Sequence, residues 1–429
     1  MINNINNIVW IVTTILIVFV GIYFGISLKF PQFKFKKIIK SFNEGNTNKK
    51  GLDSFKSLTL ALGARIGVGS LSGIAIGIVN GGPGVVFWLW LSCLLCIPNS
   101  FVESSLAVKF HERDGEFFKG GPAYYIRKGL HNNWLANLYA VVLAFCYLGG
   151  LLAIQCNTIA ASVSFEYNIR LIVGIIVGVL TFIVIYKGLS SISEFSAKFV
   201  PFMGIIYMLF AFIFIIINIK NLPMAIVSIF REAFNFKAFG WGLLSSAIVI
   251  GVQRGVVSSE CGIGTGAIAS GTSDSKVATN QGYLQMFGVY FTIFVVCTST
   301  ALIVLTSGIN TGDFIGTNGI ELLSSALTDK LGVIGEIGLI FAVISFAFST
   351  ILSGYYYGEN NVKYLFGKLS KKTLLFLKLF VLAVLIYGAV MNPSDLWDIV
   401  DIGIGILSLI NVYALFRLRK EMKEEMEWI

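Results

Sequence analysis

The chain has 429 residues, of which 56% are hydrophobic and 13% charged, whereas an ordinary soluble domain carries about a quarter charged residues. This composition excludes a water-soluble protein with a conventional charged surface. The formal charge of +9 does not indicate nucleic-acid binding, because most of the basic residues lie in alternate connections between apolar segments. The composition therefore predicts an all-α integral membrane protein that forms a single domain over residues 1–429.

Eleven apolar segments are each long enough to cross a bilayer as a helix. They are expected at residues 8–28, 57–80, 84–108, 134–163, 171–187, 199–218, 240–272, 282–306, 333–357, 374–391 and 396–416. The first is not expected to be a cleaved signal peptide, because no basic residue precedes it and several lysines, from Lys29 to Lys40, follow it. We expect residues 8–28 to remain as an extra N-terminal helix.

The basic residues predict how these helices are oriented. Of the 32 lysines and arginines, 24 fall on one side of the eleven predicted spans, five on the other side and three within spans. Positively charged connections stay on the cytoplasmic side of a membrane. We therefore expect the C-terminus in the cytoplasm and the N-terminus outside, which agrees with an odd number of spans.

Residues that would support enzymatic or metal chemistry are scarce. The chain has two histidines, His111 and His131, in one charged connection, and no HExxH or Gly-x-Ser-x-Gly motif. Its cysteines lie in apolar segments, where they are expected to be small buried hydrophobes: Cys93, Cys96, Cys146, Cys156, Cys261 and Cys297. We expect no enzyme activity, no cofactor and no structural metal.

Two of the spans differ from the rest because glycines recur two residues apart within them. The second span reads GARIGVGSLSGIAIGIVNGGPG from Gly63, and the seventh reads SSECGIGTGAIASGTS from Ser258. Such spacing favours an unwound segment. The unpaired backbone groups of an unwound segment are too costly to expose to lipid, so protein or a water-filled cavity must surround them. Both spans are therefore predicted to be broken helices that mark an interior site.

The two breaks also suggest an internal repeat. Ile66-Gly67-Val68-Gly69 resembles Ile263-Gly264-Thr265-Gly266, five spans later and in the opposite predicted orientation. Paired broken helices of this kind indicate a secondary transporter built from an inverted repeat. The two five-helix halves are expected at residues 57–218 and 240–416.

A second interpretation of the glycines is close helix packing. A stripe of small residues four apart is typical of helix interfaces in membranes. The second span carries such a stripe, at Gly69, Gly73, Gly77 and Gly81. Packing and a break are both compatible with this sequence.

Polar residues at membrane depth are candidates for function because burying them is costly. They are Arg65, Glu103, Gln155, Asn157, Gln253, Arg254 and Glu260. Arg254 and Glu260 are six residues apart and could form either a gating pair or a structural pair. Gln155 and Asn157 are two residues apart and therefore do not share a helix face. Of the two, Gln155 is the better candidate for a cavity.

Hydroxyl groups in the ninth span suggest a cation site. Ser349 and Thr350 lie side by side in the sequence Phe348-Ser349-Thr350. Hydroxyl oxygens suit a hard monovalent cation, but they also bond the carbonyls of their own helix. Both possibilities remain open.

Several motifs in a fixed order resemble the alanine or glycine:cation symporters, bacterial and archaeal carriers of small amino acids. The motifs are GARIGVGSLSGIA, GGPGVVFWLW, GGPAYYIRKGL, QCNTIA, VPFMGIIY, QRGVVSSECGIG, VVCTSTALIVLTSG and FSTILSGYYYGE. The resemblance covers nearly the whole chain. It implies a leucine-transporter arrangement of ten helices after one extra helix, in a prokaryotic cell membrane.

The resemblance also implies where substrate and ion bind. Backbone amides of Gly67, Val68, Gly69 and Ser70 would receive an amino acid's carboxylate at a half-helix, and carbonyls near Gly264 would take its ammonium group. The carbonyls of Gly63 and Ile66 and the hydroxyls of Ser349 and Thr350 would bind sodium. Sodium would stabilise the outward-open state in which substrate binds, and this would couple the two gradients.

The sequence departs from the family pattern around the implied substrate site. Val68 and Ser70 replace residues of the usual Gly-Thr-Gly-Asn, Thr292 replaces an aspartate, and Gly354 replaces a tryptophan, whereas Gln155 is retained. The tryptophan's loss predicts a larger pocket. We therefore expect symport of a small neutral amino acid, either alanine or glycine or a somewhat larger one.

Other functions are also compatible with this sequence. The altered site would also suit a transporter-like sensor that binds an amino acid without moving it, or a symporter that uses another cation. A channel and a membrane enzyme are less favoured, because the chain carries its own internal repeat and lacks a catalytic constellation. The sequence leaves the oligomeric state open.

Overall fold

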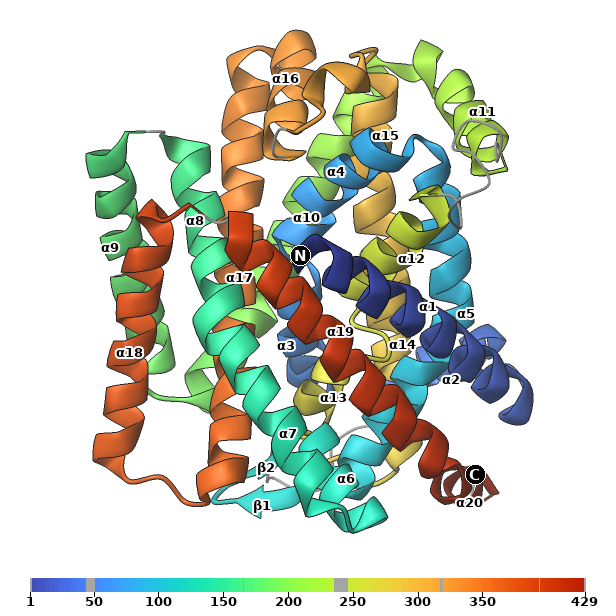
Figure 1. The fold of residues 1–429 in the computed structure, drawn as a ribbon, viewed down its shortest axis with the longest axis vertical. Coiled ribbons are helices and arrows are strands. Elements are labelled where there is room, and N and C mark those ends of the chain that lie inside the picture. The colour runs from blue at the N-terminus through green and yellow to red at the C-terminus, as the bar shows by residue number, and fades with distance from the viewer. Residues whose placement is uncertain are drawn as a thin grey trace.

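The computed structural model describes residues 2–43, 51–164, 166–234, 246–316, 319–392 and 394–427, which form long helices side by side with short elements at two ends (Figure 1). The α-helices are α1 (Ile2–Ser27), α2 (Phe35–Asn43), α3 (Ser54–Arg65), α4 (Ser72–Gly81), α5 (Gly84–Lys109), α6 (Pro122–Leu130), α7 (Asn133–Ala144), α8 (Leu152–Val163), α9 (Tyr167–Ile185), α10 (Leu189–Ile217), α11 (Leu222–Ala233), α12 (Ser246–Ser259), α13 (Thr265–Ser270), α14 (Ala278–Tyr290), α15 (Thr298–Thr306), α16 (Gly319–Leu331), α17 (Val333–Phe366), α18 (Lys371–Val390), α19 (Ser394–Arg417) and α20 (Arg419–Glu427). Short 3-10 turns are η1 (Pro31–Phe33), η2 (Val68–Ser70), η4 (Ile219–Asn221) and η7 (Thr311–Phe314). Two π-helical segments, η3 (Phe145–Leu151) and η6 (Phe291–Cys297), join α7 to α8 and α14 to α15.

The described residues contain the long apolar helices that the sequence predicted. Nine of their helical runs are long and apolar enough to cross a membrane, and the bent pair α3 and α4 makes a tenth. The predicted span 240–272 corresponds to α12 and α13, of which only Ala247–Ser259 is an apolar helix, shorter than a full crossing. Residues 240–245 lie outside the described part of the chain. The helical class is confirmed, and the count of eleven spans remains a prediction.

Several elements differ from the predicted spans. Helix α10 begins at Leu189 instead of residue 199, and α17 continues to Phe366 instead of residue 357. Hydropathy marks only the part of a helix that matches the hydrocarbon, and polar turns continue beyond it. A small antiparallel hairpin, β1 (Glu112–Asp114) with β2 (Phe117–Lys119), was not predicted, because it lies in a polar connection.

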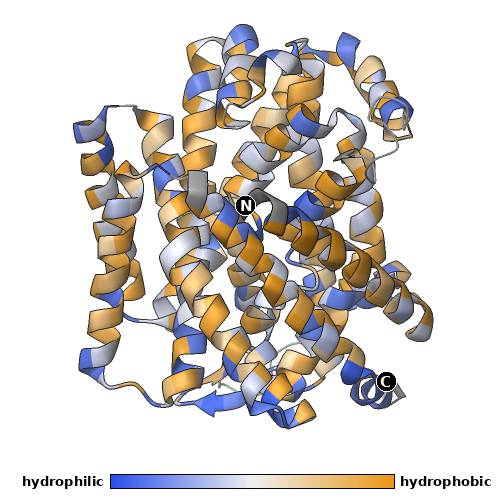
Figure 2. Cartoon of the chain, viewed as in Figure 1, coloured by the Kyte–Doolittle hydropathy of each residue, from blue (hydrophilic) through white to orange (hydrophobic). Residues whose placement is uncertain are grey.

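Apolar side chains cover the outside of the helices. Figure 2 shows hydrophobic residues along the lengths of α9 and α18, with hydrophilic residues gathered in the connections. On these outer helices Ile183 is 62% exposed and Phe376 is 71% exposed. A soluble protein would not expose such apolar faces, but lipid solvates them favourably. Inside, α12 and α14 both pack against α5.

The extra helix α1 packs in parallel with the last long helix, α19. Asn6 Nδ2 donates to Asp398 Oδ1 at 3.4 Å near the beginning of both helices. The rings of Tyr23 and Phe416 lie 5.2 Å apart near their ends. The beginnings of α1 and α19 therefore lie on one side of the molecule and their ends on the other.

Both predicted helix breaks are present. α3 ends at Arg65 and the helix resumes beyond Gly67 with a bend of 61°. α12 ends at Ser259, and α13 begins at Thr265. The four-residue glycine stripe also has a packing role, because a Cβ at Gly81 would lie 3.3 Å from Ala247 Cα on α12 and one at Gly73 would lie 3.7 Å from Arg254 Cδ. The first broken helix thus combines a break with close packing.

One end of the molecule is closed by contacts between separate segments. Leu52 forms a bridge with Ser273, and Gly51 N donates to Glu116 O at 2.8 Å. Lys363 Nζ lies 3.3 Å from Asp114 Oδ2 on β1. These contacts join the start of α3, the segment after α13, the hairpin and the end of α17.

Candidate functional site

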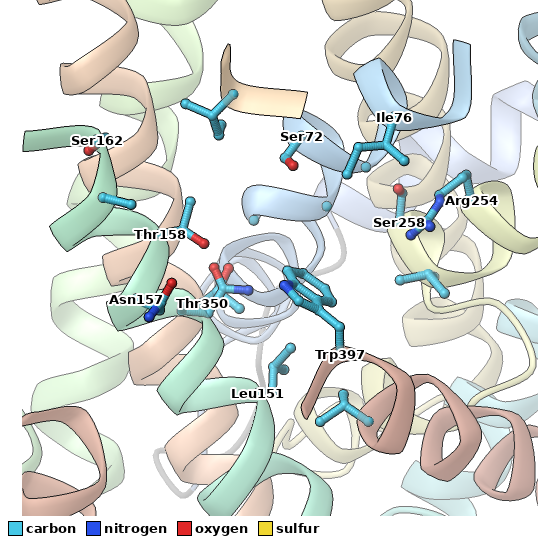
Figure 3. Close-up of a pocket in the computed structure, with 18 of the residues that line it drawn as sticks. Ser72, Ile76, Leu151, Asn157, Thr158, Ser162, Arg254, Ser258, Thr350 and Trp397 are labelled. Atoms are coloured by element: carbon cyan, nitrogen blue, oxygen red, sulfur yellow. The ribbon is translucent and has the colours of Figure 1, made fainter. Parts of the chain in front are cut away.

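A cavity of about 720 Å³ lies between the broken helices. Its wall is formed by α3 and α4, by η3 and α8, by α12, and by parts of α16, α17 and α19. In Figure 3, Asn157 and Thr158 of α8 lie on one side, Arg254 and Ser258 of α12 lie on the opposite side, and Trp397 of α19 reaches between them. The cavity extends to Glu321 on α16 and Asp398 on α19, at the end away from the hairpin.

At the first break, two glycine residues form part of the cavity wall. Gly67 and Gly69 line it, and no heavy atom lies within 4 Å of a Cβ built on Gly69. Ser70 behaves differently from the prediction: its amide donates to Gly67 O at 3.0 Å and its hydroxyl donates to Arg65 O at 3.1 Å. Val68 is buried behind the wall. Gly67 and Gly69 are therefore the residues of the break that a ligand in the cavity can reach.

Two hydroxyls of α17 contact the end of α3. Ser349 Oγ donates to Gly63 O at 3.2 Å, and Thr350 Oγ1 donates to Gly63 O at 3.0 Å. Both also donate to Phe346 O of their own helix at 2.9 Å, so the bonding to their own helix that the sequence left open is present, and the cation site remains a prediction. Ile66, the residue that follows α3 at the break, is buried. Of these residues, Thr350 lines the cavity.

The second break has a left-handed backbone. Glu260, Gly262 and Gly264 have φ values of 58°, 80° and 91°. Its carbonyls already accept hydrogen bonds: Tyr139 Oη donates to Ile263 O at 2.9 Å and Asn411 Nδ2 donates to Gly262 O at 3.0 Å. A Cβ on Gly264 would lie 2.3 Å from Pro122 Cγ, so this glycine is packed against α6 and does not line the cavity.

A buried ion pair connects the two breaks. Arg65 Nε lies 3.8 Å from Glu260 Oε2, and both side chains are at most 5% exposed. Arg65 Nη1 donates to Gln285 Oε1 at 2.8 Å, while Tyr147 Oη donates to Glu260 Oε1 at 3.3 Å. The suggested Arg254–Glu260 pair is wrong, because the left-handed turn after Ser259 directs Glu260 toward α3. Arg65 and Glu260 both line the cavity.

The two amide residues of α8 have different partners. Asn157 Nδ2 donates to Gly388 O at 2.8 Å and to Met391 O at 2.7 Å, and so attaches α8 to α18. Gln155 is buried and lines the cavity, and its Oε1 has no hydrogen-bond partner among the described residues. An unpaired buried oxygen is costly unless a ligand or water satisfies it. Gln155 is therefore the amide available to a ligand.

Two residues at which the sequence departs from the family pattern lie outside the cavity wall. Thr292 lies in η6, and its hydroxyl donates to Gly288 O at 2.9 Å. A Cβ on Gly354 would lie 3.0 Å from Leu152 Cδ1 and 3.4 Å from Tyr147 Cδ1. These two side chains occupy the space next to Gly354. The expected enlargement of the pocket at this glycine is therefore not present.

Some cavity residues were not identified from the sequence. Tyr147 and Leu151 come from the π-helical segment η3, and Trp397 and Asp401 come from α19. A π-helical turn shifts which side chains face the interior, and such turns are frequent at functional sites. The Gly149-Gly150 pair inside an apolar span was the available signal for η3. Trp397 and Asp401 lie near the start of a span, where polar and aromatic residues are common.

Comparison with known proteins identifies the family. The model of the sodium:alanine symporter family matches residues 1–428. The chain belongs to this family. It is therefore a multi-pass membrane transporter and not an enzyme, as predicted from the motifs.

Individual relatives agree with this assignment. The amino-acid carrier protein AlsT of Bacillus subtilis is 35% identical over 420 residues, which cover 97% of this chain and 88% of AlsT. The sodium/alanine symporter AgcS of Methanococcus maripaludis is 32% identical over 436 residues, covering 97% of this chain and 94% of AgcS. The crystal structure of MhsT in complex with L-phenylalanine has a TM-score of 0.62 at 13% identity, covering 85% of this chain and 89% of MhsT. The last likeness confirms the predicted leucine-transporter-like fold.

Proposed function

We propose that the protein is a sodium-coupled symporter that carries a small neutral amino acid into the cell by alternating access. The observation that carries this proposal is that an exposed helix break, an unpaired amide oxygen and a hydroxyl of α17 meet in one cavity. They belong to Gly69, Gln155 and Thr350. The names of AlsT and AgcS support an amino acid as cargo and sodium as the coupling ion.

The substrate's carboxylate is assigned to the first break. The amides of Gly67 and Gly69 precede α4, whose N-terminal end carries a partial positive charge that favours an anion, whereas Val68 lies behind the cavity wall. Ser70 has its amide committed to Gly67 O, so it supports the turn and does not contact the substrate. Gln155 Oε1 is placed to accept a hydrogen bond from the substrate's ammonium group.

The ammonium group also needs a negative partner. Carbonyls near Gly264 were the expected partners, but Gly262 O and Ile263 O already accept hydrogen bonds from protein side chains. Glu260 lines the cavity and its Oε2 has no hydrogen-bond partner among the described residues. We assign the ammonium contact to Glu260. Three other residues that were expected to contact the substrate, Gly264, Thr292 and Gly354, do not line the cavity.

Sodium is assigned to the junction of α3 and α17. The hydroxyl oxygens of Ser349 and Thr350 each lie within 3.2 Å of Gly63 O, to which they donate. A sodium ion there would bind these oxygens together with the carbonyl of Ile66. Hard cations of this kind prefer oxygen ligands. Binding would hold α3 against α17 and stabilise the state in which the cavity is open, so that ion and substrate favour the same conformation.

The charge distribution orients the molecule in a prokaryotic cell membrane. The end that carries the hairpin, α6 and α20 has most of the basic connections and is assigned to the cytoplasm. The cavity reaches Glu321 and Asp398 at the opposite end. The structure would then correspond to an outward-open state, with the N-terminus outside and the C-terminus in the cytoplasm.

Uptake into proteoliposomes tests the proposal. Purified protein is reconstituted, and uptake of labelled alanine, glycine and glutamine is measured with an inward sodium gradient, with potassium in place of sodium, and with a proton gradient alone. Concentrative uptake only with sodium is the expected result. Uptake indifferent to sodium would overturn the assigned ion, and saturable binding without uptake would identify a sensor.

Competition with unlabelled amino acids defines the cargo. The space beside Gly354 is filled by Leu152 and Tyr147, which favours a small side chain. We expect alanine and glycine to compete best and phenylalanine to compete poorly. Strong competition by phenylalanine would show that these two side chains move aside.

A further inference from the structure

Helix α2 lies at the edge of the molecule, next to the end of α1 (Figure 1). Lys29 and Phe30 adopt left-handed conformations with φ values of 57° and 51°, and they turn the chain away from α1. The turn η1 follows, and α2 then packs against α14. The helix is nine residues long, too short to cross a bilayer, so it is positioned near the membrane surface.

The side chains of α2 fall on three different faces. Ile38 and Ser41 are buried against the protein. Phe35, Ile39 and Phe42, spaced four and three residues apart, form an apolar face and are 54%, 66% and 41% exposed. The apolar face continues onto the preceding turn, where Phe30 and Phe33 are 48% and 56% exposed.

The third face is basic. Lys36 is exposed on α2, and Lys29 is exposed at the end of α1. Residues 28–43 contain five lysines and no acidic residue. The pKa of Lys34 is lowered by burial and by the positive charges of Lys37 and Lys29. This segment therefore concentrates positive charge beside an exposed apolar face.

Contacts with α14 hold this arrangement in place. The rings of Phe42 and Phe287 lie 4.9 Å apart edge to face, and Lys37 Nζ lies 5.8 Å from the centre of the Tyr283 ring. Tyr290 Oη donates to Gln32 O in η1 at 2.7 Å. A helix that is fixed on one side presents its other two faces in a constant orientation.

We propose that η1 and α2 form a binding surface for anionic phospholipids of the cytoplasmic leaflet, with the aromatic face in the acyl region and the lysines at the headgroups. An amphipathic helix with an apolar face and lysines on its polar side lies in the plane of a membrane interface. Anionic headgroups attract juxtamembrane lysines, whereas zwitterionic headgroups offer them little net attraction. Four aromatic side chains exposed together, Phe30, Phe33, Phe35 and Phe42, favour contact with lipid over contact with water. This inference does not depend on the identity of the cargo.

Lipid binding by the intact protein tests the charged face. Native mass spectrometry of the detergent-solubilised protein is carried out with added phosphatidylglycerol or phosphatidylcholine of equal chain length. The wild type should retain phosphatidylglycerol several-fold more than phosphatidylcholine, and the variant K29Q/K36Q should lose most of this preference. The matched control, K371Q/K372Q, removes the same charge from exposed lysines at the start of α18 and should keep the preference. Equal retention of both lipids by the wild type, or equal loss in both variants, would overturn the proposal.

Spin labels test the apolar face separately. A label at position 39, introduced as Ile39→Cys, should be accessible to oxygen and protected from a water-soluble nickel reagent in vesicles containing phosphatidylglycerol. A label introduced as Lys36→Cys should be accessible to the nickel reagent. The six native cysteines are buried, so labelling is expected at the introduced site. A label at position 39 that is accessible to nickel would show that this face contacts water or only a soluble partner, and would overturn the proposal.

Discussion

The two helix breaks look alike in sequence, but the structure uses them differently. The first break has no left-handed residue between Ile66 and Leu71, and its Gly69 faces open space in the cavity. The second break contains three left-handed residues, and its carbonyls bond to Tyr139 and Asn411. The backbone of the first break is therefore available to a ligand, whereas the backbone carbonyls of Gly262 and Ile263 in the second are bonded to the protein itself.

This difference shows that glycines have two separate reasons to occur in a broken membrane helix. At Gly264 the backbone conformation itself requires glycine, since φ is 91°. At Gly67 the requirement is space, since a Cβ would lie 2.5 Å from Thr350 Oγ1. We therefore expect substitutions at the two breaks to have different effects on the protein.

The largest effect is expected where the two breaks are joined, at Arg65. Replacing it in Arg65→Ala leaves Glu260 buried without its cation, which should destabilise the protein by about 3–5 kcal/mol. Thermal unfolding of the purified variant measures this loss. Arg254→Ala is the matched control, because Arg254 also lines the cavity but makes no ion pair with Glu260. Equal melting temperatures for the two variants would show that the breaks are not joined through Arg65.

The double variant R65A/E260Q sharpens this result. Removing both charges avoids a buried unpaired carboxylate, so the double variant should be more stable than Arg65→Ala alone. If the free energy of unfolding lost in the double variant equals the sum of the losses in Arg65→Ala alone and Glu260→Gln alone, the two side chains act independently.

The next effect separates the breaks directly. Gly264→Ala introduces a left-handed alanine and a Cβ 2.3 Å from Pro122 Cγ, and the strain and overpacking together should cost about 2–4 kcal/mol. Gly69→Ala places its methyl group in open space, so the folded protein should be retained while substrate affinity falls. Yield of monodisperse protein and substrate binding are measured for both. A poorly folded Gly69→Ala beside a normal Gly264→Ala would reverse the comparison.

A smaller effect is expected at the contact between the first break and α17. Thr350→Val removes a proposed sodium ligand, and the sodium concentration for half-maximal uptake should rise about tenfold, equivalent to about 1.4 kcal/mol. Ser353→Ala is the control, because Ser353 Oγ donates to Leu60 O at 2.8 Å and also connects α17 to α3, one turn further along. A similar rise in both variants would mean that Thr350 acts only by packing the helices together.

The sequence predicted the location of both breaks because backbone unwinding leaves a local signature. Glycines two apart at Gly67 and Gly69, and again at Gly262 and Gly264, identify the breaks without knowledge of the fold. Apolar length predicted the long helices for the same reason, since each must match the bilayer. The family motifs then predicted how these helices are arranged.

The sequence did not predict which polar groups meet. Arg65 and Glu260 are far apart in the chain, and only the left-handed turn at the second break directs Glu260 toward α3. The filling of the space beside Gly354 likewise depends on η3, whose π-helical geometry positions Tyr147. Both features depend on tertiary packing. The departures from the family pattern at Thr292 and Gly354 carry no information about that packing.

The smallest effect is expected at a site remote from both breaks, the hairpin residue Glu112. Its carboxylate pairs with Arg127 and Lys128, and although burial opposes ionisation, these charges hold its pKa below the usual value. Such a group stabilises the fold above its unfolded pKa of about 4.3 and loses this contribution as pH falls through its lower folded pKa. Because solvent screens this partly exposed pair, Glu112→Gln should cost less than about 1 kcal/mol at pH 7. Thermal melting from pH 7 to pH 3 should show the difference from wild type shrinking toward zero, and a cost comparable to that of Arg65→Ala would mean that the breaks are not the most stability-sensitive part of the molecule.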